Sequence, residues 1–165
     1  MGGMKNKKEE KKPDPLICTH HEARRDYFVL ETIEAGIVLT GAEVKSLREA
    51  KSSLAGSFAR FEKKELFMYN FYIAPYEKAS SVNPPDPNKP RKLLLHKSQL
   101  EKIHSKVKEK GIALIPLKLY WNPYGIAKVE LSLAKGKKHH DKRAEIKKDT
   151  TRREIDRAIK NRNRR

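Results

Sequence analysis

The sequence predicts a mainly β fold with short helices, in which an OB-fold-like antiparallel β-barrel is followed by a disordered basic C-terminal tail. Three observations lead to this prediction. Apolar and aromatic residues recur in about six short runs bounded by turn residues, as in small barrels of the oligonucleotide-binding type. Two stretches before residue 134 instead have helical periodicity. After Leu133 the apolar pattern stops and basic residues dominate.

These shifts in composition divide the chain into three parts. Residues 1–19 are rich in Lys, Glu and Pro and offer almost nothing to bury, so we expect a disordered leader. Residues 20–133 hold the apolar runs of the barrel. Residues 134–165 carry 14 Lys and Arg against 5 Asp and Glu and form the basic tail.

The first strand begins after Asp26 with the run YFVLETI, which predicts a strand that buries much of both faces. Gly36, inside the continuing apolar run, indicates a bulge or a sharp bend. Gly41 is then expected to act as a hinge, because glycine takes a positive φ without steric cost. Beyond it a short helix follows, with an exposed edge whose two cations, Lys45 and Arg48, are spaced to hold phosphate.

The middle of the chain predicts a hairpin and a long loop. The run FARFEKKELFMYNFYI divides into two aromatic-rich strands around a four-residue loop, Glu62 to Glu65. Residues 75–91 hold five of the nine prolines and no periodicity, so we expect a loop.

A second helix and two further strands complete the barrel. Leu100, Ile103 and Val107 have helical spacing, with a capping box at Ser98 and Glu101 and a stop at Gly111. Its lysines are interpreted as a solvated face: Lys102, Lys106 and Lys110. GIALIPLKLY and IAKVELSL then predict strands. Pro116 indicates an edge or a bulge in the first. In the second, Ala127, Val129, Leu131 and Leu133 should point inward, and Lys128, Glu130 and Ser132 outward.

The net charge of +17 points to a polyanionic partner, of which nucleic acid is the commonest. A single cysteine, Cys18, excludes an intramolecular disulfide and favours a reducing compartment. No apolar run approaches the ~20 residues of a membrane span, so we expect a cytoplasmic protein without a membrane partner. The histidines lack the ligand spacing of a zinc site and are interpreted as polar loop residues: His20, His21, His139 and His140. We expect neither a metal nor another cofactor.

The tail has too little apolar surface to dock. Ile155 and Ile159 share one helical face, whereas Ile146 falls on the opposite side. Opposite charges four residues apart, such as Asp149 with Arg153, favour helix by roughly 0.2 to 0.5 kcal/mol per pair. We therefore expect a segment that is helical only when a partner holds it.

Three motifs together carry a family resemblance: EAGIVLTGAEVKSLR at 34–48, PRKLLLHK at 90–97 and AKGKKHHDKR at 134–143. In order and spacing, from about residue 22 to the end, they resemble the SsrA-binding protein family, the partners of transfer-messenger RNA (tmRNA) in trans-translation. His20 stands where the family usually has asparagine.

The resemblance implies an adaptor without catalytic residues. Its barrel would bind the tRNA-like domain of tmRNA through Glu34 and a second patch of Arg91, Lys92 and Leu94. The adaptor would meet elongation factor Tu only through the charged RNA, and we expect a monomer. The tail would enter the decoding centre and the empty mRNA channel of a stalled ribosome and contact small-subunit rRNA. The tail residues assigned to this contact are Lys137, Lys138, His140, Asp141, Lys142, Arg143, Ile155 and Ile159.

Two alternatives stay open at this point. An RNA-processing enzyme would draw its acid and base from Glu34, His96 and Asp141, although no paired carboxylates support it. A general single-strand-binding barrel would need exposed aromatic residues, and most aromatic residues here fall in presumptive core strands.

Overall fold

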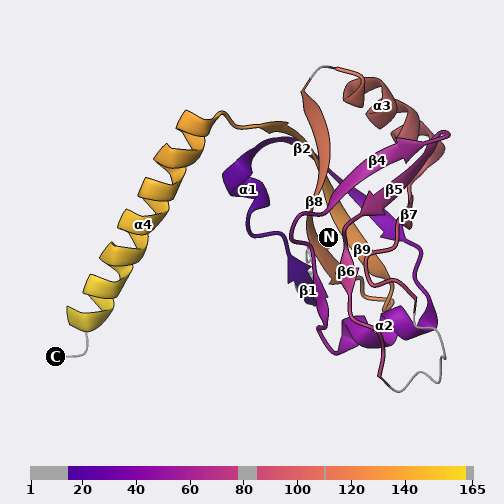
Figure 1. Ribbon diagram of the computed structural model, residues 1–165, viewed down its shortest axis with the longest axis horizontal. Helices are drawn as coiled ribbons and strands as arrows, with labels where there is room; N and C mark the ends of the chain where they lie inside the picture. Colours follow the sequence, from indigo (N-terminus) through magenta and orange to yellow (C-terminus); the bar gives the residue numbers. More distant parts are fainter. Residues whose placement is uncertain (1–14, 78–84, 110, 163–165) are drawn as a thin grey trace, which may run out of the picture.

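The computed structural model describes residues 15–77, 85–109 and 111–162. A ring of strands carries a helix at either end, and a long helix projects from it (Figure 1). The elements in chain order are β1 Leu16–Thr19, α1 Ala23–Asp26, β2 Tyr27–Ile37, α2 Gly41–Arg48, β3 Ser52–Ser53, β4 Phe58–Glu62, β5 Glu65–Tyr69, β6 Tyr72–Ile73, β7 Arg91–Leu94, α3 Lys97–Val107, β8 Ile112–Trp121, β9 Ala127–Gly136 and α4 His139–Arg162.

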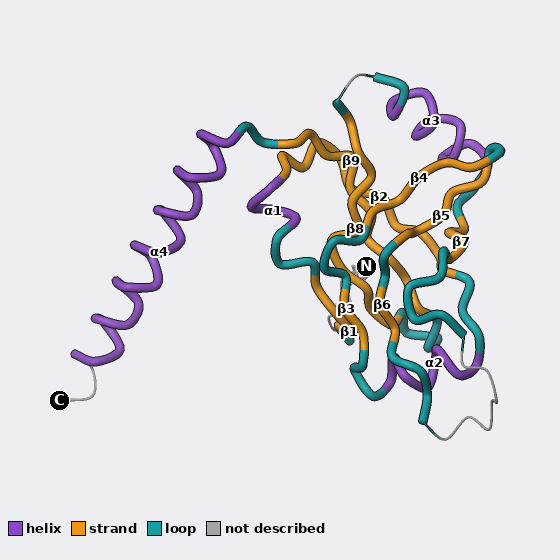
Figure 2. Tube along the Cα trace, viewed as in Figure 1, coloured by secondary structure: helices purple, strands orange, loops and turns teal. Residues whose placement is uncertain are grey.

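The main sheet closes on itself. Its strand order is β1-β8-β4-β5-β7-β2-β9, and β8 also pairs with β9. Every pairing is antiparallel. This ring, seen as the orange strands of Figure 2, confirms the predicted OB-like, mainly antiparallel β fold.

The core lies inside the ring, and the alternation of β9 was predicted with one exception. Its four predicted inward residues are buried: Ala127, Val129, Leu131 and Leu133. Ser132 was expected to face outward, but it is fully buried, and its hydroxyl donates to the Ile115 carbonyl at 2.9 Å. A polar serine can be buried at this position because its hydroxyl has a hydrogen-bond partner. The register of β8 shifts between Pro116 and Lys118, which confirms the bulge predicted at Pro116.

The prediction for β2 was wrong in its first half. Phe28, Val29 and Leu30 are 49%, 39% and 57% exposed, because this part of the strand extends past the core towards α1. The irregular register lies between Val29 and Glu31 and not at Gly36. Gly36 has another role. A Cβ built there would lie 3.3 Å from the Cβ of Leu94, so glycine permits a close approach of β7.

The corner before α2 is made by a capping box and not by a glycine hinge. The Thr40 hydroxyl accepts from the Glu43 backbone N–H at 3.4 Å, and the Glu43 carboxylate accepts from the Thr40 N–H at 2.8 Å. Gly41 is simply the first helical residue and does not have a positive φ. The sequence contains the signal for this box, since Thr40 precedes Glu43 by three residues.

Two local turns also differ from the prediction. The hairpin between β4 and β5 has a two-residue loop, in which Lys63 and Lys64 both have positive φ. Glu62 and Glu65 are paired strand residues and not loop residues. Helix α3 starts after His96, whose backbone N–H donates to the Gln99 side chain at 3.3 Å, so the capping box predicted at Ser98 and Glu101 is wrong.

The boundary predicted at residue 19 is also wrong. Leu16–Thr19 form β1, which pairs with β8, and the backbone N–H of Trp121 donates to the Pro15 carbonyl at 3.0 Å. His20 lies in the connection between β1 and α1, as predicted, but it is buried, and its Nδ1 lies 3.0 Å from the Pro116 carbonyl oxygen. The rest of the predicted leader, residues 1–14, lies outside the described residues. At the other end, β9 continues past Leu133 to Gly136.

In the tail, His139–Arg162 form one helix, α4, and the prediction that this segment is helical only with a partner stays a prediction. At about 1.5 Å per residue a helix of this length spans about 36 Å. Figure 1 shows it leaving the ring beside α1 and projecting away from it. Glycine and proline are absent from 139–162, so nothing in this sequence interrupts a helix once it starts. No described helix is both long enough and apolar enough to cross a membrane.

Candidate RNA interface

The ring brings two predicted RNA-binding residues, Glu34 and Leu94, onto one face. Glu34 and Gly36 lie on the same side of β2, because side chains alternate along a strand. Gly36 pairs with Leu94 of β7. Leu94 is 51% exposed, and its side chain lies over Gly36, where a Cβ would come within 3.3 Å of the Leu94 Cβ. A carboxylate and a solvent-exposed apolar side chain therefore stand close together.

Cross-strand neighbours hold the Glu34 carboxylate. One oxygen accepts a hydrogen bond from the Tyr120 hydroxyl, and the other lies 3.4 Å from Nζ of Lys128. The Glu34 side chain is still 54% exposed. It is thus oriented by its neighbours and presented to solvent, where it can accept from base amino groups or ribose hydroxyls.

The same arrangement continues along the strands. Glu130 pairs with Glu34 in register, and its carboxylate lies 2.9 Å from Nζ of Lys118. Lys118 also lies over the ring of Tyr120, with Nζ 5.5 Å from the centroid. We call the residues Glu34, Lys118, Tyr120, Lys128 and Glu130 the Glu34 cluster. Together with Leu94 they cover the outer face of β7, β2, β9 and β8.

Lys92 joins this face, whereas Arg91 does not. The two are adjacent in β7, so their side chains point to opposite sides of the sheet. Lys92 points outward with Leu94 and pairs with Glu65. Arg91 points inward and is only 2% exposed. The role implied for Arg91 in the RNA-binding patch is therefore corrected, because a buried guanidinium cannot reach RNA.

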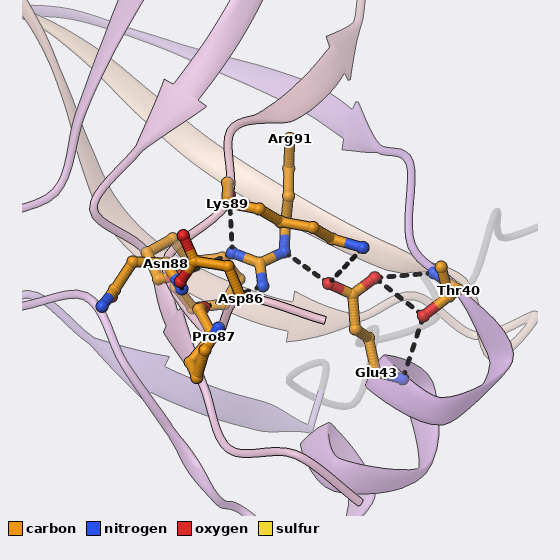
Figure 3. A network of polar contacts seen from close by, with 8 residues as sticks. Thr40, Glu43, Asp86, Pro87, Asn88, Lys89 and Arg91 are labelled. Atoms are coloured by element: carbon orange, nitrogen blue, oxygen red, sulfur yellow. Dashed lines mark hydrogen bonds and ion pairs between the residues drawn. The ribbon is translucent and has the colours of Figure 1, made fainter. Parts of the chain in front are cut away.

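Arg91 instead ties the loop before β7 to helix α2 (Figure 3). Its Nε donates to the Glu43 carboxylate at 2.8 Å. Its other nitrogens donate to backbone carbonyls, including those of Pro87 at 3.0 Å and Lys89 at 3.2 Å, and also to that of Phe71. The guanidinium thus satisfies the buried Phe71 carbonyl and links it to the loop that holds Pro87 and Lys89.

Glu43 is the acidic partner in this network. Burial by itself raises the pKa of its carboxyl, but hydrogen bonds from Thr40 and Arg91 outweigh burial and lower the pKa below 4.5. Lys89 adds an ion pair at 3.3 Å. The carboxylate is therefore stabilised in its charged form and has a structural role.

Lys45 and Arg48 are exposed on α2, as predicted. Each lies near an aromatic ring. Lys45 Nζ is 5.4 Å from the centroid of Tyr76, and the Arg48 guanidinium is 5.9 Å from that of Trp121. Trp121 follows Tyr120 in β8, so Arg48 lies near the end of the strand that contributes to the Glu34 cluster. Whether the two cations hold phosphate stays a prediction.

The structure describes the side chains of four predicted tail residues, and of these Lys137 alone contacts the ring. Lys137 is fixed to the ring, since its Nζ donates to the Arg24 carbonyl at 2.9 Å and lies 4.8 Å from the Phe28 centroid. Lys138 is exposed. In α4, Ile155 and Ile159 are 53% and 55% exposed, while the side chains of four predicted residues lie outside the described ones: His140, Asp141, Lys142 and Arg143.

The two alternative kinds of site, a metal site and a base-stacking surface, were also compared with the structure. In the described ranges no group of three or more His, Cys, Asp or Glu side chains could hold a metal ion.

The prediction that most aromatic residues lie in the core was too broad. Phe58 and Tyr69 stack at 5.5 Å on β4 and β5, with the Arg60 guanidinium 5.2 Å from the Tyr69 centroid. Because the two rings stack on each other and Arg60 lies over Tyr69, these ring faces are already covered by protein groups.

Sequence reasoning missed several residues of the outer face. Lys128 and Glu130 were predicted to point outward, but nothing indicated that they lie beside Glu34. Tyr120 was not considered. Only the register of β8, β9 and β2 brings these residues together, and register depends on pairing across the sheet.

The chain is similar to known proteins over most of its length. The model of the family described as SmpB protein matches residues 17–161. The SsrA-binding protein of Desulforudis audaxviator is 50% identical over 150 residues, 91% of this chain and 97% of that protein. The SsrA-binding protein of Thermus thermophilus is 54% identical over 140 residues, 85% and 96% of the two chains.

Among solved structures, one chain from a structure described as "tmRNA-SmpB: a journey to the center of the bacterial ribosome" is 56% identical, with a TM-score of 0.63. The match covers 76% of this chain and 86% of that chain. The matched residues begin at Ile17 and so include most of β1. The chain belongs to the SmpB protein family.

Proposed function

We propose that this protein is an RNA-binding adaptor of trans-translation, and not an enzyme, that binds the tRNA-like domain of tmRNA. Relatives that are about half identical over most of their length are named SsrA-binding proteins. The similar solved structure is described as tmRNA with SmpB and the bacterial ribosome. A net charge of +17 suits such a polyanionic partner.

The juxtaposition of Glu34 and Leu94 carries the proposal. Folding alone does not explain why a half-exposed Leu94 lies beside an oriented, half-exposed carboxylate on a strongly basic protein. A folded RNA supplies what both side chains need. Its amino groups and 2′-hydroxyls donate to the carboxylate, its base or ribose faces cover the leucine, and its phosphates face Lys92 and Lys128.

The tail extends the proposal to the ribosome. A basic helix that projects from the ring can reach a channel that the ring itself cannot enter. We place residues from Lys137 onward in the decoding centre and empty mRNA channel of a stalled ribosome, against small-subunit rRNA. The nascent chain is then tagged for degradation and the ribosome is released. The protein acts as a cytoplasmic monomer, and elongation factor Tu meets it only through the charged RNA.

A competition assay tests the RNA proposal against its rivals. Labelled tRNA-like domain is bound to the protein and displaced by unlabelled tRNA-like domain or by unstructured RNA of equal length. We expect the folded RNA to compete far better, and the RNA to stay uncleaved. Equal competition would favour a single-strand-binding barrel, centred on Phe58 and Tyr69. Cleavage that is lost on Glu34→Gln would favour an RNA-processing enzyme.

A further inference from the structure

The turn between β8 and β9 presents the most exposed large apolar side chain among the described residues. Tyr124 is 88% exposed, and Ile126 beside it is 54% exposed. A tyrosine in this position contributes nothing to the core. Exposed aromatic side chains on a protein with a basic surface are typical of contacts with nucleic-acid bases.

The turn that carries Tyr124 is rigid. The Asn122 side-chain oxygen accepts from the backbone N–H of Tyr124 at 3.0 Å and from that of Ile126 at 2.8 Å. The Asn122 backbone donates to the Ile126 carbonyl at 2.9 Å and accepts from Gly125 at 2.9 Å. Gly125 has a φ of +74°, which glycine adopts without strain. The turn backbone that presents the tyrosine is thus formed before any partner binds, which lowers the entropy cost of a contact.

The turn also continues the candidate RNA interface. It joins the two strands that supply Tyr120 and Lys128, and these two residues pair in register. At about 3.4 Å per residue, the turn lies roughly 15 to 20 Å along the sheet from Glu130, the cross-strand neighbour of Glu34. Lys128 of β9 lies between Glu34 and the turn, with its Nζ 3.4 Å from the Glu34 carboxylate. A phosphate held by Lys128 would lead the RNA from Glu34 towards Tyr124.

We infer that Tyr124 is a second RNA contact, which stacks on an unpaired base of the tRNA-like domain while Glu34 accepts its hydrogen bonds from another part of that RNA. This inference rests on the proposed function. The ligand is a nucleobase in a loop or bulge, because a base inside a duplex offers no free face. Stacking is tolerant of sequence, so the contact adds affinity and orientation and does not select one base.

The test measures binding of the isolated tRNA-like domain to the full-length protein. Tyr124→Ala should weaken binding by about 5- to 150-fold, which corresponds to about 1 to 3 kcal/mol for one stacked base. Tyr124→Phe and Tyr124→Trp should bind like the wild type, because they keep a ring, whereas Tyr124→Leu should bind like Tyr124→Ala. Asn122→Ala should cause a smaller loss, because the ring remains but its turn is loosened.

Three controls keep the result specific. Tyr72→Ala removes a tyrosine that is 42% exposed on β6 and should not change affinity. The slope of log affinity against log salt should not change in Tyr124→Ala, because no charge is lost, but should fall in Lys128→Ala. Circular dichroism melting should give the same midpoint for Tyr124→Ala and the wild type.

Unchanged affinity in Tyr124→Ala, with Glu34→Ala weakened, would overturn this inference and leave the proposed function standing. Equal losses in Tyr124→Phe and Tyr124→Ala would also overturn it, since the hydroxyl and not the ring would then matter. If the wild type itself does not prefer the tRNA-like domain over unstructured RNA, the proposed function fails first.

Discussion

Replacing Arg91 by Met tests whether this residue holds the fold or contacts RNA. Methionine fills similar space but removes the guanidinium that pairs with Glu43 at 2.8 Å and satisfies the carbonyls of Phe71, Pro87 and Lys89. Arg91 is 2% exposed and Phe71 is fully buried, so water cannot replace the guanidinium at the Phe71 carbonyl. The substitution therefore leaves this carbonyl without its Arg91 donor and removes the closest cation from the buried Glu43 carboxylate.

The expected cost is large. Removing one partner of a buried ion pair destabilises a protein by roughly 3 to 5 kcal/mol, against a total stability of about 5 to 15 kcal/mol. For a domain of this size each kcal/mol lowers the melting midpoint by about 2 to 4 °C, so we expect a shift of roughly 6 to 20 °C. Urea unfolding followed by circular dichroism measures the loss. Arg91→Lys keeps a charge for Glu43 and should lose less.

The effect should depend on pH. The pKa of Glu43 is lowered in the folded protein, so its contribution to stability is present above about 4.5, its unfolded value, and is lost as the pH falls through the folded value. In Arg91→Met, Glu43 keeps Thr40 and Lys89 but loses its closest cation, so protonating its carboxylate costs less stability than in the wild type. The difference in stability between wild type and variant should therefore narrow below about pH 4.5.

Lys92→Met is the matched control, because Lys92 is the next residue in the strand but lies on the outer face. It should lose less than about 1 kcal/mol of stability, since its ion pair with Glu65 is exposed. It should instead weaken RNA binding and reduce the salt slope. At a temperature where both are folded, Arg91→Met should keep its RNA affinity. If Arg91→Met unfolds like the wild type but binds RNA more weakly with a reduced salt slope, our account of Arg91 is wrong.

Three further predictions concern RNA and the ribosome. Glu34→Ala should weaken binding of the tRNA-like domain by about 10- to 100-fold, as expected for loss of a hydrogen bond to a charged group, without a change in circular dichroism. Glu101→Ala on α3 is the control. Unchanged affinity in Glu34→Ala would remove Glu34 from the interface. Binding should weaken steeply between low and physiological salt, because Lys and Arg displace counterions, and a salt-independent affinity in filter binding would contradict this. Deleting everything after Arg143 should leave stability and tmRNA affinity nearly intact but abolish tagging on stalled ribosomes; normal tagging by the truncated protein, or loss of its tmRNA affinity, would mean that the chain is divided in the wrong place.

The sequence was sufficient for two features that depend on neighbours along the chain, the alternation of β9 and the β4–β5 hairpin. The alternation of Ala127, Val129, Leu131 and Leu133 identified an amphipathic strand, and its inward residues are buried. The β4–β5 hairpin was found because two apolar runs are close in sequence. Its loop length was misjudged, since strand pairing decides whether Glu62 and Glu65 belong to the turn.

Features that depend on distant partners were missed. Glu43 and Arg91 are 48 residues apart, and the sequence gives no sign that they pair. Tyr120 and Glu34 are 86 residues apart and meet only through β9. Strand β1 was overlooked because it is short and follows a charged segment, and its pairing with β8 stabilises it. Arg91 and Lys92 are adjacent in a strand, so their side chains must point to opposite sides of the sheet. The sequence alone could have shown that only one of them faces outward.

Nuclear magnetic resonance mapping of the RNA-bound face tests the central claim most directly. The isotope-labelled protein is titrated with isolated tRNA-like domain, and the chemical shifts of backbone amides and methyl groups are followed. We predict that the largest changes fall at Glu34, Leu94 and Lys128, on the outer face of β2, β7 and β9. Changes concentrated instead at Phe58, Arg60 and Tyr69, on β4 and β5, would contradict the account.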